Sequence, residues 1–139
     1  MAEGMLRQWG GDKFEVYSAG LEPGAVRDEA IRVMDEIGID IGAQQSKPLG
    51  RFVNQPFDWV ITVCDSARQN CPVFPGAETS AHWAVDDPAE ATGPEEERLE
   101  AFRRARDDLR NRIHMFVLAA SRDDLPLPAA ETFIAGRDA

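Results

Sequence analysis

The stretch Asp58-Trp-Val-Ile-Thr-Val-Cys64-Asp-Ser-Ala-Arg-Gln-Asn-Cys71-Pro72 decides the fold class of this chain. Residues 59–63 are all β-branched or aromatic, which is typical of a strand covered on both faces. A thiol directly behind such a strand lies at the carboxyl edge of the sheet, where open α/β folds place their reactive groups. If residues 66–70 are helical, Cys64 also lies at a helix start, where the helix dipole favours a negatively charged sulfur. The stretch therefore predicts an α/β protein with a reactive cysteine at a sheet edge.

Cys64 and Cys71 are the only cysteines in the chain. Seven residues of helix rise about 10.5 Å, whereas a disulfide requires Cα atoms within roughly 7 Å of each other. The two sulfurs can bond only if the segment between them unwinds or is already irregular. The spacing therefore indicates a redox pair on a movable segment.

Three other interpretations of the cysteines were weighed. Burial as small hydrophobic side chains is the commonest fate of free cysteine, and the spacing alone leaves it favoured. A structural disulfide needs an oxidising compartment, which nothing in the sequence indicates. A zinc site would need His82 and His114 as further ligands, and their wide spacing fits no usual zinc pattern.

Length and composition exclude several classes of protein. A chain of 139 residues suits one domain, which buries about two thirds of its unfolded surface. No apolar run reaches membrane-spanning length, and the N-terminus lacks the pattern of a signal peptide, so we expect no membrane partner and, by default, a cytoplasmic location. The formal net charge of -10 argues against nucleic acid as a partner. A small anionic substrate would need local features such as the amides of a helix start.

Helix and strand patterns alternate along the chain, which predicts a parallel sheet with helices on both faces. The patterns place helices at 2–9 and 26–37, strands at 14–20, 59–63 and near 81–85, and a long helix that opens at Thr92-Gly-Pro-Glu95. This long helix has an apolar face formed by Leu99, Phe102, Leu109, Ile113, Phe116 and Val117. We expect one domain over residues 1–120. Pro126, Pro128 and mixed charges predict that residues 121–139 form a loose tail.

The beginning of the chain departs from the pattern of a complete parallel α/β unit. The first helix pattern starts at the first residue, without a Ser, Thr, Asp or Asn before it to cap the free amides. A parallel sheet needs a strand before its crossover helix, and no strand precedes this one. We therefore expect that the chain begins in the middle of a motif and lacks a first strand.

Six segments carry a combined motif. They read Met1-Ala-Glu-Gly-Met-Leu-Arg, Val16-Tyr-Ser-Ala-Gly-Leu-Glu-Pro23, Ala30-Ile-Arg-Val-Met-Asp-Glu-Ile-Gly-Ile-Asp-Ile41, Val60-Ile-Thr-Val-Cys64, Asn70-Cys-Pro72 and His82-Trp-Ala-Val-Asp-Asp-Pro88. Together these segments resemble the thioredoxin-coupled arsenate reductases, which share the low-molecular-weight tyrosine phosphatase fold. The resemblance covers roughly residues 1–117 in one register.

The resemblance implies a four-stranded parallel sheet whose first strand ends in a Cys-x5-Arg loop, followed by Ser-Gln and then the segment that opens this chain. That strand and loop are absent from the sequence. We therefore expect the DNA upstream of Met1 to encode them in frame, and we expect the chain to be inactive without them.

The resemblance also implies a role for three residues. In the family the loop cysteine attacks arsenate, and an aspartate before proline, matched by Asp87, protonates the leaving oxygen. Cys64 matches the second cysteine, which attacks the arsenic-bound sulfur and releases arsenite. Cys71 matches the third, which takes over the disulfide and presents it to thioredoxin. Cys64, Cys71 and Asp87 are thus the expected catalytic residues, with no cofactor.

Two alternative functions remain open. Plain phosphatases of this fold need the loop cysteine and the aspartate but not a pair such as Cys64 and Cys71. The pair therefore disfavours a low-molecular-weight phosphatase. A non-catalytic, thioredoxin-interacting remnant follows if the 139-residue chain is what the cell makes.

Further residues have simpler interpretations. Asp87 before Pro88 is, without the family context, an ordinary turn. His82 and Trp83 are expected to pack at a strand end. Arg51 and Arg68 are expected to be solvated.

Glu3 and Ser18 match positions that bind a potassium ion in some relatives. Lys47 stands where those relatives have an aspartate, and its ammonium group would repel and replace the cation. We therefore expect no bound metal.

Overall fold

The computed structural model describes residues 1–21, 24–70, 74–122 and 130–136. Its helices are α1 (Ala2–Gly10), α2 (Asp28–Asp35), α3 (Asp65–Asn70) and α4 (Glu95–Arg122), and its single-turn 3-10 helices are η1 (Gly11–Lys13), η2 (Leu49–Arg51) and η3 (Pro88–Glu90). Its strands are β1 (Phe14–Gly20), β2 (Phe57–Thr62), β3 (Ala77–His82) and β4 (Ala130–Gly136). All strand pairs are parallel, in the order β1-β4-β2-β3. The expected α/β architecture with a parallel sheet is confirmed.

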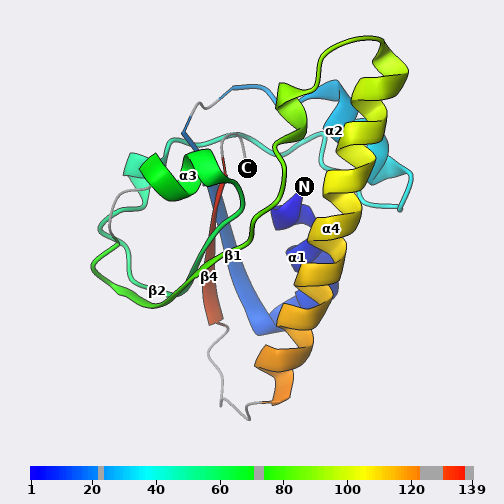
Figure 1. Ribbon diagram of the computed structural model, residues 1–139. Helices are drawn as coiled ribbons and strands as arrows, with labels where there is room; N and C mark the ends of the chain where they lie inside the picture. Colours follow the sequence, from blue (N-terminus) through cyan, green and yellow to red (C-terminus); the bar gives the residue numbers. More distant parts are fainter. Residues whose placement is uncertain (22–23, 71–73, 123–129, 137–139) are drawn as a thin grey trace.

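Each face of the sheet is covered by its own core. Helices α1, α2 and α4 bring apolar side chains such as Met5, Val33 and Ile113 onto one face, where they pack with Val16 of β1 and Ile134 of β4. Figure 1 shows these three helices grouped on one side of the sheet, with α3 apart from them. The other face is covered by a smaller cluster that consists of Ala19, Leu49, Phe52, Phe57, Val60 and Phe74. The sheet is therefore buried on both faces, as the apolar run in β2 predicts.

Most expected elements are present with small shifts at their ends. Strand β1 has the bounds expected from the alternating pattern, and the segment behind Cys64 is helical as expected. The strand expected near 81–85 overlaps β3 only at Ala81 and His82, because β3 runs from Ala77 to His82. This strand lies at the edge of the sheet, and its Glu78, Thr79 and Ser80 are exposed. Because an edge strand needs little apolar surface, its first residues carry no hydrophobic signal.

The expectation of a loose tail over residues 121–139 is wrong for two parts of that segment. Helix α4 continues to Arg122, and residues 130–136 form β4. Strand β4 lies between β1 and β2 and pairs with both, with Thr132 opposite Val16 on one side and Trp59 on the other. Two ladders of backbone hydrogen bonds and the complete burial of Thr132 and Ile134 hold this strand. The described sheet thus has four strands, and the position between β1 and β2 is filled from the C-terminal segment.

The register of the strands brings their carboxyl ends to one edge. Gly20 of β1 lies opposite Gly136, and Thr62 of β2 lies opposite Ala135. Thr62 also lies opposite His82, the last residue of β3. Residues that follow these strands therefore meet at a single edge of the sheet.

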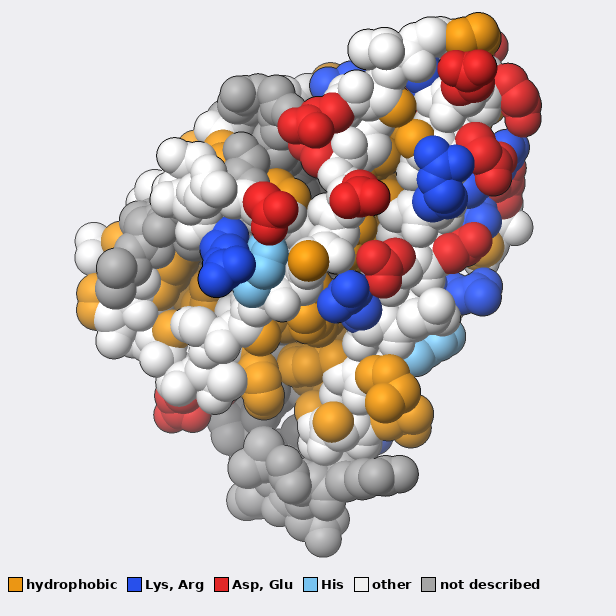
Figure 2. Space-filling view, viewed as in Figure 1, with side chains coloured by type: hydrophobic (Ala, Val, Ile, Leu, Met, Phe, Trp, Pro, Cys, Tyr) orange, Lys and Arg blue, Asp and Glu red, His pale blue; other side chains and the backbone are white. Residues whose placement is uncertain are grey.

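Helices α2 and α4 are joined by ion pairs on the surface of the molecule. Glu36, at the end of α2, accepts hydrogen bonds from Arg103 at 2.9 Å and from Arg106 at 2.7 Å. Arg98 binds Glu29 at 3.1 Å, and Arg32 pairs with Glu95. Figure 2 shows acidic and basic side chains interspersed over this part of the surface. None of the helices within the described ranges combines the length and the apolar character needed to cross a membrane.

The substitution Ile134→Ala tests the inner position of β4. Ile134 is fully buried between the sheet and the helices, so the shorter side chain should leave a cavity and lower the free energy of unfolding by about 2–5 kcal/mol. Urea denaturation measures this loss. The control is Leu118→Ala, which truncates a side chain that is 57% exposed and should change stability by less than about 0.5 kcal/mol. An equally small effect of Ile134→Ala would contradict the described sheet.

Glu36 should contribute a pH-dependent part of the stability. The hydrogen bond from Arg103, together with a weaker effect of Arg106, lowers the pKa of Glu36 from 4.5 to about 2. A lowered pKa in the folded state stabilises the fold above the pKa of the unfolded chain, and this contribution is lost as the pH falls from about 4.5 toward 2. The urea midpoints of the parent and of Glu36→Gln should therefore differ at pH 6 and converge as the pH approaches 2. Arg103→Gln should remove only part of this pH-dependent contribution, because Arg106 still donates to Glu36. A constant difference between parent and Glu36→Gln at all pH values would refute the assignment.

Candidate active site

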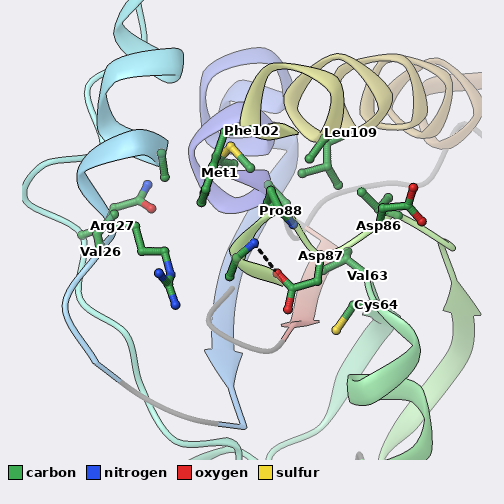
Figure 3. Close-up of a pocket in the computed structure, with 16 residues that line it drawn as sticks. Met1, Val26, Arg27, Val63, Cys64, Asp86, Asp87, Pro88, Phe102 and Leu109 are labelled. Atoms are coloured by element: carbon green, nitrogen blue, oxygen red, sulfur yellow. Dashed lines mark hydrogen bonds between the residues drawn. The ribbon is translucent and has the colours of Figure 1, made fainter. Parts of the chain in front are cut away.

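A cavity of about 90 Å³ opens at the carboxyl edge of the sheet. It lies where the end of β2, the starts of α1 and α2, and η3 come together (Figure 3). Its polar part includes Arg27, Cys64 and Asp87, and its apolar wall includes Phe102 and Leu109 of α4. Three segments that are far apart in the sequence therefore contribute chemically active groups to one small space.

Cys64 occupies the position that the sequence predicts, two residues after β2 and directly before α3. Its Sγ accepts a hydrogen bond from the backbone N–H of Ala67 at 3.4 Å, and its carbonyl accepts one from Arg68 at 3.0 Å. The residue is only 6% exposed. The first turn of α3 thus contacts the sulfur, and little of Cys64 is open to solvent.

Asp87 is both a turn residue and part of the cavity. Its Oδ1 accepts a hydrogen bond from the backbone N–H of Ala89 at 2.9 Å, and Pro88 begins the short helix η3 behind it. The expectation of an ordinary Asp-Pro turn therefore describes its local structure correctly. Asp87 also lines the same cavity as Cys64 (Figure 3).

Arg27 is a cavity residue that the sequence analysis missed. It precedes the first residue of α2 and is the only Lys or Arg among the described residues that line the cavity. A single arginine before a helix carries no sequence signal, because most surface arginines are only solvated. Together with the amides at the starts of α1 and α2, Arg27 makes this end of the cavity suitable for an anion.

The other expected positions lie elsewhere. Cys71 falls in the segment 71–73, outside the described residues. Arg51 and Arg68 are exposed, as expected, and do not line the cavity. Trp83 packs edge-on against Phe116, with ring centroids 5.9 Å apart.

A second polar cluster lies beside α1. The buried carboxylate of Glu3 accepts a hydrogen bond from Ser18 and pairs with Arg7 at 2.8 Å. Lys47, which was expected to supply the positive charge here, donates instead to the carbonyl of Gln45 at 3.0 Å. The cation that contacts Glu3 is therefore Arg7, which lies one helical turn away in α1. The i,i+4 spacing of Glu3 and Arg7 is the sequence feature from which this pair could be predicted.

Comparisons with known proteins agree on the family of this chain. The model of the low molecular weight phosphotyrosine protein phosphatase family matches residues 1–125. An arsenate reductase of Halalkalibacterium halodurans is 43% identical over 116 residues, and one of Bacillus subtilis is 41% identical over 116 residues; each match covers 84% of both chains. A solved arsenate reductase in the phosphate binding state superposes with a TM-score of 0.70 at 32% identity, over 86% of each chain. An arsenate reductase in the oxidized state gives a TM-score of 0.71 at 33% identity.

Proposed function

The chain belongs to the low molecular weight phosphotyrosine protein phosphatase family, and from this premise we propose that it serves in the reduction of arsenate to arsenite through a cysteine relay that thioredoxin regenerates. The observation that carries the proposal is that Cys64 and Asp87 line one cavity at the carboxyl edge of the sheet. Similarity to proteins named arsenate reductase supports the same substrate.

Arsenate is a small tetrahedral oxyanion, and the cavity offers groups that suit it. Arg27 and the helix starts supply positive potential. Asp87 stands on a turn that Pro88 and the Ala89 hydrogen bond hold in place. In its protonated form this carboxyl group can give its proton to an oxygen that leaves arsenic as water.

The first attack on arsenic needs a thiolate in a loop of backbone amides. Neither Cys64 nor Cys71 is followed by arginine at the Cys-x5-Arg spacing, since Asn70 and Ala77 stand at those positions. We propose that the attacking thiolate belongs to a Cys-x5-Arg loop placed against the start of α1, where Met1 lines the cavity. Its sulfur bonds to arsenic(V) as water leaves.

Cys64 then completes the reduction. Its thiolate attacks the sulfur that is bonded to arsenic, a disulfide forms, and the electron pair of the broken sulfur–arsenic bond leaves with arsenite. The thiolate of Cys71 next attacks the sulfur of Cys64 and releases the first cysteine as a thiolate. Thioredoxin reduces the resulting Cys64–Cys71 disulfide with its two thiols. Two electrons pass in total from thioredoxin to arsenic.

The disulfide between Cys64 and Cys71 can be tested on the 139-residue chain itself. Treatment with diamide should remove both free thiols, and addition of reduced thioredoxin should restore both. Mass spectrometry of the peptides should show one intramolecular bond. Cys64→Ser and Cys71→Ser are the matched controls, and each should leave one thiol that cannot pair within the chain. Two thiols that stay free under diamide would return the pair to the role of buried packing residues.

Arsenate turnover provides a second test. Residues 1–139 alone should not reduce arsenate at a useful rate, because neither of their cysteines lies in a Cys-x5-Arg loop. A chain with a strand and a Cys-x5-Arg loop fused ahead of Met1, and without residues 130–136, which occupy the position between β1 and β2, should reduce it. In that fused chain, Cys64→Ser should abolish arsenate reduction but leave hydrolysis of an aryl phosphate, which needs no second thiol.

The fused chain also distinguishes an arsenate reductase from a phosphatase. Asp87→Asn retains an oxygen that accepts from Ala89 but removes the transferable proton, so it should lower both activities by about 10²–10⁴-fold. Aryl phosphate hydrolysis without any arsenate reduction would favour a phosphatase. Robust arsenate turnover by residues 1–139 alone would show that the first nucleophile has been assigned wrongly.

A further inference from the structure

We infer that His82 is a positioning residue that keeps the first turn of α3 closed over Cys64 and thereby sets how often this thiol is exposed. The inference rests on the proposed function, because it concerns the thiol that the relay uses. It assigns His82 a role beyond the packing at a strand end that the sequence suggested.

The imidazole of His82 connects two strand ends to the start of a helix. Its Nδ1 lies 2.7 Å from Oγ1 of Thr62, the last residue of β2. Its Nε2 lies 3.2 Å from Oδ1 of Asp65, the first residue of α3. The strand register supports this geometry, since Thr62 and His82 lie opposite each other in the sheet.

The donors and acceptors of the three side chains fit one arrangement. A carboxylate only accepts hydrogen bonds, so Nε2–H of His82 donates to Asp65. In the neutral ring Nδ1 is then an acceptor, and it can receive the hydroxyl hydrogen of Thr62. The tautomer is thus set by both neighbours, and every polar atom of the imidazole has a partner.

Cys64 lies in the chain between Thr62 and Asp65, which His82 holds from either side. Its sulfur is covered and accepts the hydrogen bond of Ala67, which is itself fully buried. We expect the sulfur to become more exposed when the first turn of α3 moves away from the sheet, because this turn donates the Ala67 hydrogen bond to it. The His82–Asp65 contact is broken by this movement, whereas the His82–Thr62 contact lies within the sheet and is retained.

The contact between His82 and Asp65 is well suited to shift the equilibrium between the closed and the open first turn of α3 without dominating it. The side chain of Asp65 is 77% exposed, so water competes for its oxygens, whereas that of His82 is 19% exposed. One such hydrogen bond changes an equilibrium by roughly two- to tenfold. Helix α3 has only six residues, so its own hydrogen bonds give little further resistance to opening.

Two substitutions of His82 separate the two contacts. His82→Asn keeps a polar atom near the position of Nδ1, so it should retain the hydrogen bond to Thr62 and lose the one to Asp65. His82→Gln keeps a polar atom near the position of Nε2 and should retain the bond to Asp65. Asp65→Ala removes the same contact from the other side.

The test measures alkylation of the reduced 139-residue chain by iodoacetamide, followed at the Cys64 peptide by mass spectrometry. Cys64 should react roughly two- to tenfold faster in His82→Asn and in Asp65→Ala than in the parent or in His82→Gln. The double variant His82→Asn/Asp65→Ala should be no faster than either single variant. The urea midpoint of Asp65→Ala should stay close to that of the parent, because the Asp65 side chain is 77% exposed, so its faster alkylation would not reflect a loss of global stability.

Other outcomes overturn the inference. Equal alkylation rates in His82→Asn and His82→Gln, additive effects in the double variant, or acceleration that simply follows a loss of global stability would each show that His82 only packs. Alkylation requires neither arsenate nor a disulfide, so the relay and this inference can fail separately. If the Cys64–Cys71 bond does not form but alkylation changes as expected, the positioning role stands and the relay does not.

Discussion

Strand β4 pairs on both sides, and the rest of the structure depends on this arrangement. Without it β1 and β2 would each present an unpaired row of backbone groups inside the molecule, which is costly when no water can reach them. Its two ladders fix β1 and β2 at one register, and Ile134 joins the core that α1, α2 and α4 share. A strand from the C-terminal segment thus determines how elements from the first half of the chain are placed.

The common direction of the strands explains the position of the site. Because all pairs are parallel, the chain leaves β2 and β3 at the same edge, and the helices begin or pass there. The cavity is therefore lined by Arg27 before α2, Cys64 after β2 and Asp87 after β3, although these residues are far apart in the sequence. The same geometry lets His82, at the end of β3, reach Thr62 and Asp65 on either side of Cys64.

The burial of Cys64 and the chemistry proposed for it place opposite demands on α3. A covered sulfur is protected from oxidants, but attack on another sulfur requires access. A six-residue helix whose first turn contacts the sulfur of Cys64 and the side chain of His82 can meet both demands, since so short a helix can open locally while the sheet stays intact. Helix α4, in contrast, packs along the core, and its Phe102 and Leu109 form the apolar wall of the cavity.

Local sequence patterns determined several helices and strands of this protein. Several elements each bury an apolar surface of their own and could therefore be recognised from the sequence: the apolar run before Cys64, the alternating strand at 14–20, and helices α1 and α4. The position of Cys64 behind a strand could be recognised in the same way. Only the tertiary structure decided that residues 130–136 form the inner strand, because that strand is stabilised by ladders to β1 and β2 and not by a pattern of its own. It also decided that Arg27 enters the cavity, that Arg7 replaces Lys47 beside Glu3, and that His82 contacts Asp65. These contacts join residues whose proximity arises from strand order and register, which no local pattern encodes.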